Sequence, residues 1–190
     1  QGATACELLL YHRKAEKPYA VIPFPENYRI GNVYSMIVFG LNVEEFEYAY
    51  RLDGPYDPKK GLLFDKEHVL LDPYAKAVTG QSTWGKRVSP AGYRARVVRN
   101  NFYWGAEVCP KIPMEELVIY ELHVRGFTKM AKDVNAPGTF AGIQEKIPYL
   151  KELGVNAIEL MPIFEFDELS ECRTVDGKEL LNYWGYNTVC

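Results

Sequence analysis

The stretch that decides the fold is a pair of apolar segments, LVIYELHV at 117–124 and VNAIELMPIF at 155–164. Apolar, β-branched runs of this kind are typical of parallel strands, which are buried on both faces. Between them, Thr139 has the side chain of a helix N-cap, and apolar residues recur with helical spacing as far as Gly154. The two runs are separated by the length of a strand, helix, strand crossover. Pro148 interrupts the helical segment, so a kink or two short helices are expected there.

The first part of the chain has a different pattern. Short strands separated by turns rich in Pro and Gly are expected at 6–11, 20–22, 33–39 and 46–52. The last of these alternates aromatic and apolar residues with Glu47, Ala49 and Arg51, so one of its faces is expected to be solvated. Residues 93–98 form another candidate extended segment. This pattern predicts an antiparallel β-sandwich rather than strand, helix, strand units.

The two patterns divide the chain into three parts. Residues 1–84 are expected to form a partial N-terminal β-sandwich, 85–113 a connecting segment, and 114–190 the opening of an α/β unit. Two parallel strands need further strands and a helical cover to bury their faces. Because Gln1 is also not an initiator residue, the whole is expected to be a fragment.

Composition narrows the class of protein. The chain has 190 residues, of which 47% are hydrophobic, and a net charge of -3, so neither nucleic acid nor an anionic membrane is an expected partner. No run approaches the roughly 18 apolar residues of a membrane helix. The scattered cysteines contain no C-x-x-C pair and predict free thiols in a reducing cytoplasm, although a disulfide stays open: Cys6, Cys109, Cys172 and Cys190.

Charged candidates for chemistry lie where the two strands end. Three alternate residues of the first run are expected on one face, either as part of a site or as a buried, mutually hydrogen-bonded set, which is favoured: Glu121, His123 and Arg125. The second run is followed by acidic residues that are either catalytic carboxylates or a solvated turn, and the turn is favoured: Glu165, Asp167 and Glu168. Glu159, in mid-strand, is expected to pair within the core.

No cofactor or metal site is expected. The three histidines lie in separate segments without a second ligand at zinc-like spacing: His12, His68 and His123. Phosphate-binding, dinucleotide-binding and nucleophile-elbow motifs are also missing from the sequence.

Two aromatic clusters remain as candidate binding surfaces. The segment NYWGYNT at 182–188 combines flat rings with amides, a composition suited to the apolar face of a sugar, although core packing is favoured for Tyr183 and Trp184 from the residues alone. Gly185 permits a bend that presents Tyr186. The segment NFYW at 101–104 fits either a sugar platform or a seal between domains, with the seal favoured.

Seven segments, in order along the chain, resemble the isoamylase and glycogen debranching branch of the α-amylase superfamily, glycoside hydrolase family 13. They are RLDGP (51–55), LLDPYAK (70–76), YELHVRGFT (120–128), GTFAG (138–142), YLKELGV (149–155), ELMPIF (159–164) and YWGYN (183–187).

The resemblance implies a multidomain fold: an incomplete β-sandwich similar to a carbohydrate-binding module, then the first two βα units of a (β/α)8 TIM barrel. It implies a parent enzyme that hydrolyses α-1,6 branch points of an α-glucan such as glycogen, amylopectin or limit dextrin, with retention. It also implies that Tyr186 stacks on the glucose beside the scissile bond and that Asn187, Trp184 and Tyr183 shape the same wall.

The family's catalytic carboxylates are expected beyond Cys190, so none of the acidic residues here is assigned as a catalyst and the fragment itself is expected to be inactive. No cofactor is implied, and no cluster of oxygen ligands places a Ca²⁺ ion. Alternatives remain open: a branching enzyme, a pullulanase or a trehalohydrolase of the same family, or a glucan-binding protein without activity.

Overall fold

The computed structural model describes residues 2–81, 83–86 and 92–190. Part of the expected connecting segment, residues 87–91, therefore lies outside the described residues. The chain divides into two compact units: residues 1–101 with Cys190, and residues 102–189. Each unit is described by itself.

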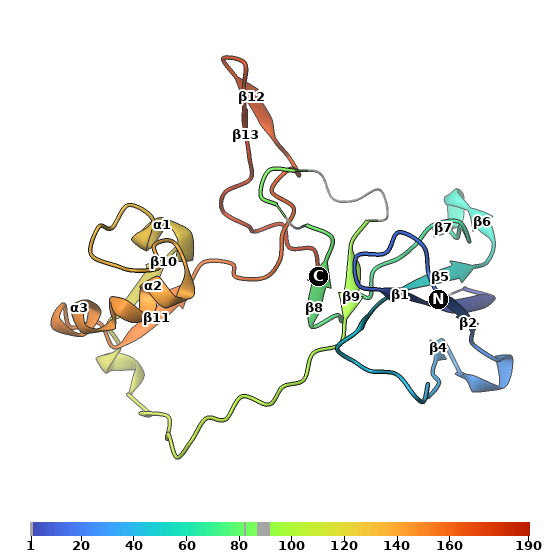
Figure 1. The fold of residues 1–190 in the computed structure, drawn as a ribbon, viewed down its shortest axis with the longest axis horizontal. Helices are drawn as coiled ribbons and strands as arrows, with labels where there is room; N and C mark the ends of the chain where they lie inside the picture. Colours follow the sequence, from blue (N-terminus) through green and yellow to red (C-terminus); the bar gives the residue numbers. More distant parts are fainter. Residues whose placement is uncertain (1, 82, 87–91) are drawn as a thin grey trace. The chain divides into compact units, whose positions relative to one another are not determined.

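The first unit is built on a five-stranded antiparallel sheet in the order β2-β1-β5-β9-β8 (Figure 1). In the central pair, Leu9 lies opposite Ala49 and Leu8 opposite Tyr50. The strands are β1 (Ala5–His12), β2 (Ala20–Pro23), β5 (Phe46–Asp53), β8 (Ala77–Thr79) and β9 (Arg94–Arg96). The strands expected at 6–11, 20–22 and 46–52 are thus confirmed. Because β9 is paired with β5 and β8, residues expected to connect two domains belong in part to this sheet.

The core of the first unit lies against the face of β5 that the alternation predicted to be solvated. Ala49 is fully buried and packs with Leu9 and Tyr11, while Val69 covers them. Glu47, on the same face, is only 4% exposed. The expectation of a wet face was wrong because Val69 packs over Ala49 and its neighbours and the arginine of β9 pairs with Glu47 there.

The strand expected at 33–39 is wrong over most of its length. Only β4 (Val33–Tyr34) pairs, in a short ribbon with β3 (Arg29–Ile30). Ile37 and Phe39 are 77% and 85% exposed, and none of the described strands pairs with residues 35–39 to hold them extended. Other short elements of this unit are η1 (Glu26–Tyr28), β6 (Tyr56–Asp57), η2 (Pro58–Lys60) and β7 (Leu62–Leu63).

The second unit contains the predicted parallel pair. Strands β10 (Ile119–Leu122) and β11 (Ala157–Leu160) are parallel, with Ile119 opposite Ala157 and Leu122 opposite Leu160. Between them lie α1 (Val124–Thr128), α2 (Phe140–Glu145) and α3 (Ile147–Glu152) (Figure 1). The prediction that both faces of these strands are buried was wrong, since Ile119 is 52% exposed. The sheet described here consists of these two strands alone, so little of the chain packs against it.

The helical crossover follows the sequence closely. The Thr139 hydroxyl accepts a hydrogen bond from Gly142 N at 3.2 Å, which confirms it as the N-cap of α2. The segment divides at Lys146 into two short helices, as Pro148 predicts. Gly142 allows α2 to approach α1, since a Cβ there would lie 2.8 Å from the Thr128 hydroxyl oxygen.

The remaining elements of the second unit are η3 (Met114–Glu116), β12 (Arg173–Val175) and β13 (Lys178–Leu180). Strands β12 and β13 form an antiparallel hairpin whose two-residue turn has positive φ at Asp176 and Gly177, a pairing of residues typical of a tight hairpin turn. Among the residues that the structure describes, no helix has the length and apolar composition needed to cross a membrane.

Candidate functional site

The candidate site lies where β10 and β11 end. Because the two strands are parallel, the residues that follow each of them leave the sheet at the same edge. After β10 the chain turns into α1, and after β11 it enters a segment that includes the β12–β13 hairpin and runs to the aromatic residues 182–188. Contacts between these two segments build the site.

The expected polar face of Glu121, His123 and Arg125 does not form. Strand β10 ends at Leu122 and helix α1 begins at Val124, so side chains stop alternating before His123. Glu121 is exposed and lies beside Glu159 in the register of the two strands. Glu159 is itself exposed and is not a buried, core-paired residue as predicted.

His123 has instead become the N-cap of α1. Its Nδ1 accepts a hydrogen bond from Gly126 N at 3.0 Å, and its Nε2 lies 3.0 Å from the carbonyl oxygen of Tyr183. Its ring stacks on the Tyr183 ring with centroids 4.3 Å apart and planes 20° apart. Trp184 meets both rings edge-on, at 5.8 Å from His123 and 5.3 Å from Tyr183. The structure therefore brings His123 together with Tyr183 and Trp184, which lie about 60 residues later in the sequence.

The segment that carries these aromatics is tied to the chain after β11. Asn182 N donates to the Glu168 carbonyl at 2.8 Å, and Val189 N donates to the Glu165 carbonyl, also at 2.8 Å. Between these ties, Phe166 and Thr188 form an isolated antiparallel bridge. The loop from Asn182 to Val189 is thus held at both ends.

Gly185 fits closely inside this loop. It has φ 77°, and a Cβ there would lie 2.9 Å from the Phe166 ring. Glycine is required here for two reasons. A residue with a side chain would have a strained backbone at this φ, and its Cβ would collide with the Phe166 ring. The bend leaves Tyr186 68% exposed and Trp184 53% exposed. Core packing, favoured from sequence for Trp184, is therefore wrong within the described residues, and Tyr183 is also 38% exposed.

Asn187 is exposed, and its side-chain amide donates to the Ser170 hydroxyl at 2.9 Å. Of the four residues expected to form a glucan-facing wall, Tyr183 and Trp184 touch each other, and Tyr186 and Asn187 follow in the same loop. Phe166 and Gly126 were not among the candidates. The sequence did contain a signal for Gly126, because it lies three residues after His123, where a helix N-cap would accept a hydrogen bond from its backbone amide.

The acidic segment after β11 is only partly a solvated turn. Glu168 is 1% exposed, whereas Glu165 is exposed. Desolvation and the neighbouring Glu168 carboxylate raise the pKa of Glu165 above its ordinary value. Asp167 accepts a hydrogen bond from Leu169 N, which is local turn chemistry. The backbone carbonyls of Glu165 and Glu168 hold the aromatic loop, and the Asp167 carboxylate shapes the turn between them.

The other candidates do not join this site. His12 stacks on Tyr19 in the first unit, and His68 lies in a turn of the same unit. Phe102, Tyr103 and Trp104 are exposed, with Phe102 and Trp104 in edge-on contact. Within the described residues no group of three or more potential ligands could hold a metal ion, and all four cysteines are free thiols.

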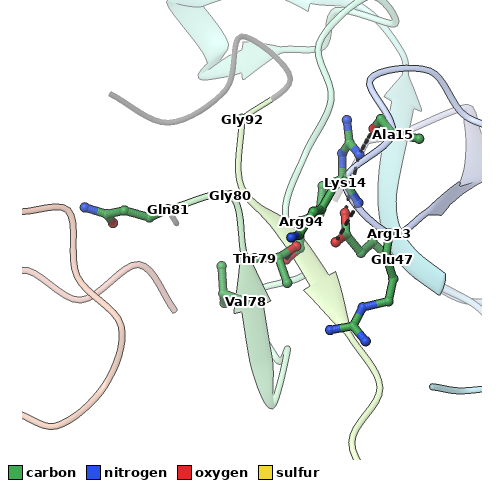
Figure 2. Close-up of a pocket in the computed structure, with 10 residues that line it drawn as sticks. All are labelled: Arg13, Lys14, Ala15, Glu47, Val78, Thr79, Gly80, Gln81, Gly92 and Arg94. Atoms are coloured by element: carbon green, nitrogen blue, oxygen red, sulfur yellow. Dashed lines mark hydrogen bonds and ion pairs between the residues drawn. The ribbon is translucent and has the colours of Figure 1, made fainter. Parts of the chain in front are cut away.

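The first unit contains a pocket of about 390 Å³ (Figure 2). Its buried charges are Arg94 and Glu47, which form an ion pair at 3.4 Å. Arg94 also donates to the carbonyl oxygens of Ala15 and Glu16 and lies 3.7 Å over the Tyr11 ring. These groups hold β9 to the loop after β1, so the two buried charges of the pocket are paired within the chain.

Comparison with known proteins agrees with both units. Residues 1–75 match the model of carbohydrate-binding module 48, the isoamylase N-terminal domain, and residues 99–186 match the α-amylase catalytic domain. Isoamylase 1 of Arabidopsis thaliana, a chloroplastic protein, is 36% identical over 99% of this chain. The glycogen operon protein GlgX homolog of Haemophilus influenzae is 34% identical over 84% of the chain.

A solved structure gives the same answer for the fold. The pullulanase SAP of group B Streptococcus has a TM-score of 0.64 and 25% identity, covering 87% of this chain and 22% of that protein. The chain spans about a quarter of the length of the curated relatives it matches, 25% for both isoamylase 1 and the GlgX homolog.

The fold and these matches define a chain with a carbohydrate-binding module 48 followed by part of an α-amylase catalytic domain. The chain belongs to the isoamylase and glycogen debranching branch of the α-amylase superfamily, glycoside hydrolase family 13.

Proposed function

We propose that the protein is a debranching glycoside hydrolase that cleaves α-1,6-glucosidic branch points of glycogen, amylopectin or limit dextrins with retention of configuration. Isoamylases among its relatives support this assignment. The observation that carries it is the exposed aromatic loop around Tyr186, held at the edge where two parallel strands end, since such edges are where α/β enzymes bind substrates.

In this proposal the Tyr186 ring lies against the apolar face of a glucose unit, and Trp184, Tyr183 and Asn187 form the wall beside it. A phenol suits this role because its ring is apolar while its hydroxyl stays in water. Retaining hydrolysis needs two carboxyls about 5 Å apart, one as nucleophile and one as acid and base. We place those carboxylates outside this chain, so the chain by itself would bind glucan without hydrolysing it.

In this proposal the first unit serves as the carbohydrate-binding module. Its C-terminal boundary lies near residue 101, because β9 belongs to the sheet of this unit. The partner is an α-glucan rather than a nucleic acid or a membrane. A reducing compartment, the cytoplasm, fits the four free thiols.

A pullulanase is the second candidate. It is favoured by the solved pullulanase of group B Streptococcus, which has also been seen with maltotetraose and matches with a TM-score of 0.65. Comparing hydrolysis of glycogen with hydrolysis of pullulan by the full-length protein separates the two: faster turnover of glycogen supports an isoamylase, and faster turnover of pullulan supports a pullulanase.

The test of the wall is Tyr186→Ala in the full-length protein. Loss of a stacking ring is expected to lower kcat/KM for branch-point hydrolysis by about tenfold or more. The unfolding temperature should stay near that of the wild type because Tyr186 is 68% exposed.

Tyr149→Ala is the matched control, since Tyr149 is 51% exposed on α3 and has no place in the wall. Wild-type hydrolysis by the Tyr186 variant would remove this residue from the substrate site.

A further inference from the structure

His123 uses both of its ring nitrogens on backbone groups of its own chain. A backbone N–H can only donate, so Nδ1 accepts from Gly126, and a carbonyl can only accept, so Nε2 carries the proton toward Tyr183. The geometry therefore fixes one neutral tautomer. A histidine engaged in this way has no nitrogen left to exchange a proton with a substrate, which argues against a role as general acid or base.

The same side chain fixes the Tyr183 ring. Stacking at 4.3 Å holds the phenol against the imidazole, and the phenol oxygen reaches the first turn of α1. A Cβ on Gly126 would lie 2.7 Å from that oxygen, so the turn leaves room for the phenol only because residue 126 is glycine. His123 and Gly126 together form the seat of Tyr183.

Tyr183 lies at the start of the loop that presents Tyr186. The loop is tied by Asn182 N to the Glu168 carbonyl and by Val189 N to the Glu165 carbonyl, both from the segment after β11. The contacts of His123 with Tyr183 add a tie from the segment after β10. Two neighbouring strands thereby hold one loop, β11 through the backbone of the segment that follows it and β10 through the side chain of His123.

We propose that His123 is a positioning residue for the glucan-facing wall: it couples the end of β10 to the aromatic loop and sets the direction in which Trp184 and Tyr186 meet the sugar. The inference rests on the proposed function, because it assigns His123 a part in a wall that binds glucan. His123 does not contact the sugar itself and acts on it through Tyr183 and Trp184.

Two substitutions separate the two hydrogen bonds of His123. Asparagine places an oxygen near Nδ1, so His123→Asn keeps the acceptor for Gly126 N and loses the donor to Tyr183. Glutamine places an amide nitrogen near Nε2, so His123→Gln keeps the donor to Tyr183 and loses the cap of α1. Both variants lose the stacked ring to the same extent.

The measurements are KM and kcat on a soluble limit dextrin, with the unfolding temperature, in the full-length protein. His123→Asn is expected to raise KM about tenfold, the effect of losing one hydrogen bond, with a smaller change in kcat and an unfolding temperature near the wild type. His123→Gln is expected to rescue KM toward the wild-type value while lowering the unfolding temperature.

Equal KM values in the two variants would mean that the hydrogen bond to the Tyr183 carbonyl does not position the wall and would overturn the inference. So would a wild-type KM in His123→Asn. Tyr186→Ala, measured beside them, keeps the two proposals apart. If Tyr186→Ala weakens hydrolysis and His123→Asn does not, only the role of His123 fails, whereas wild-type hydrolysis in Tyr186→Ala refutes the wall itself.

Discussion

At the scale of single residues, Glu165 shows how the segment after β11 responds to pH. Its pKa is raised above the ordinary value of 4.5 by desolvation and by the Glu168 carboxylate. The folded protein thus holds the proton more tightly than the unfolded chain, and folding takes up a proton between the two pKa values. The contribution of Glu165 to stability is small because its side chain is exposed. It is fully present below the ordinary pKa and is lost as pH rises through the raised one.

Glu165→Gln should abolish this loss, because glutamine cannot ionise. We expect the unfolding temperature of the variant to match the wild type near pH 4 and to exceed it toward pH 7. Thermal melts followed by circular dichroism across this range provide the measurement. Glu168→Gln is the companion variant, since removing its charge should bring the pKa of Glu165 down, and a variant of Glu165 that gains nothing at neutral pH would contradict the prediction.

At the scale of secondary-structure elements, the ion pair of Glu47 in β5 and Arg94 in β9 joins two neighbouring strands. Both side chains are 5% exposed. Arg94 also holds the loop after β1 through the carbonyl oxygens of Ala15 and Glu16. Removing one charge of a buried pair leaves the other uncompensated, which costs more than the pair contributes.

Glu47→Gln is therefore expected to lower the free energy of unfolding by about 3 kcal/mol, measured by urea denaturation at an unchanged m-value. The control is Glu44→Gln, since Glu44 and Arg99 form an exposed pair at 3.8 Å with side chains 68% and 66% exposed. That variant should change the free energy by less than about 1 kcal/mol. If both variants lowered the free energy of unfolding by the same amount, burial would not account for the contribution of the Glu47–Arg94 pair.

At the scale of the whole molecule, the two units differ in how well their sheets are covered. Leu9 and Leu10 in β1 are 2% and 1% exposed, whereas Ile119 in β10 and Ile158 in β11 are 52% and 40% exposed. A parallel pair of two strands is a weak unit, because parallel pairing is less stable per residue and a two-stranded sheet buries little surface.

Amide hydrogen exchange should reveal this difference. In the 190-residue chain, the amides of β10 (Ile119–Leu122) are expected to exchange faster than those of β1 (Ala5–His12). In the full-length protein the protection of β10 should rise, because a further strand would hydrogen-bond to the edge that β11 does not occupy, and that of β1 should change little. Equal protection of β10 in both proteins would contradict the expectation.

Local features of the fold could be read from the sequence because they depend on residues close together in the chain. Thr139 caps α2 through an amide three residues away, and Pro148 divides the helical segment by its own geometry. The parallel pair was also predictable, since the length and apolar character of its two strands fit a crossover. The run at 33–39 was misread because hydrophobicity alone does not tell whether a partner strand exists.

The candidate site was only half predictable. The sequence determined one part of it: the aromatic and amide residues of 182–188 and the turn at Gly185. Only the tertiary structure decided that His123 leaves the strand to cap α1 and stacks on Tyr183, 60 residues away. The physical reason is that capping, stacking and burial depend on distances between segments, and these are set by how the strands pair rather than by the order of residues along the chain.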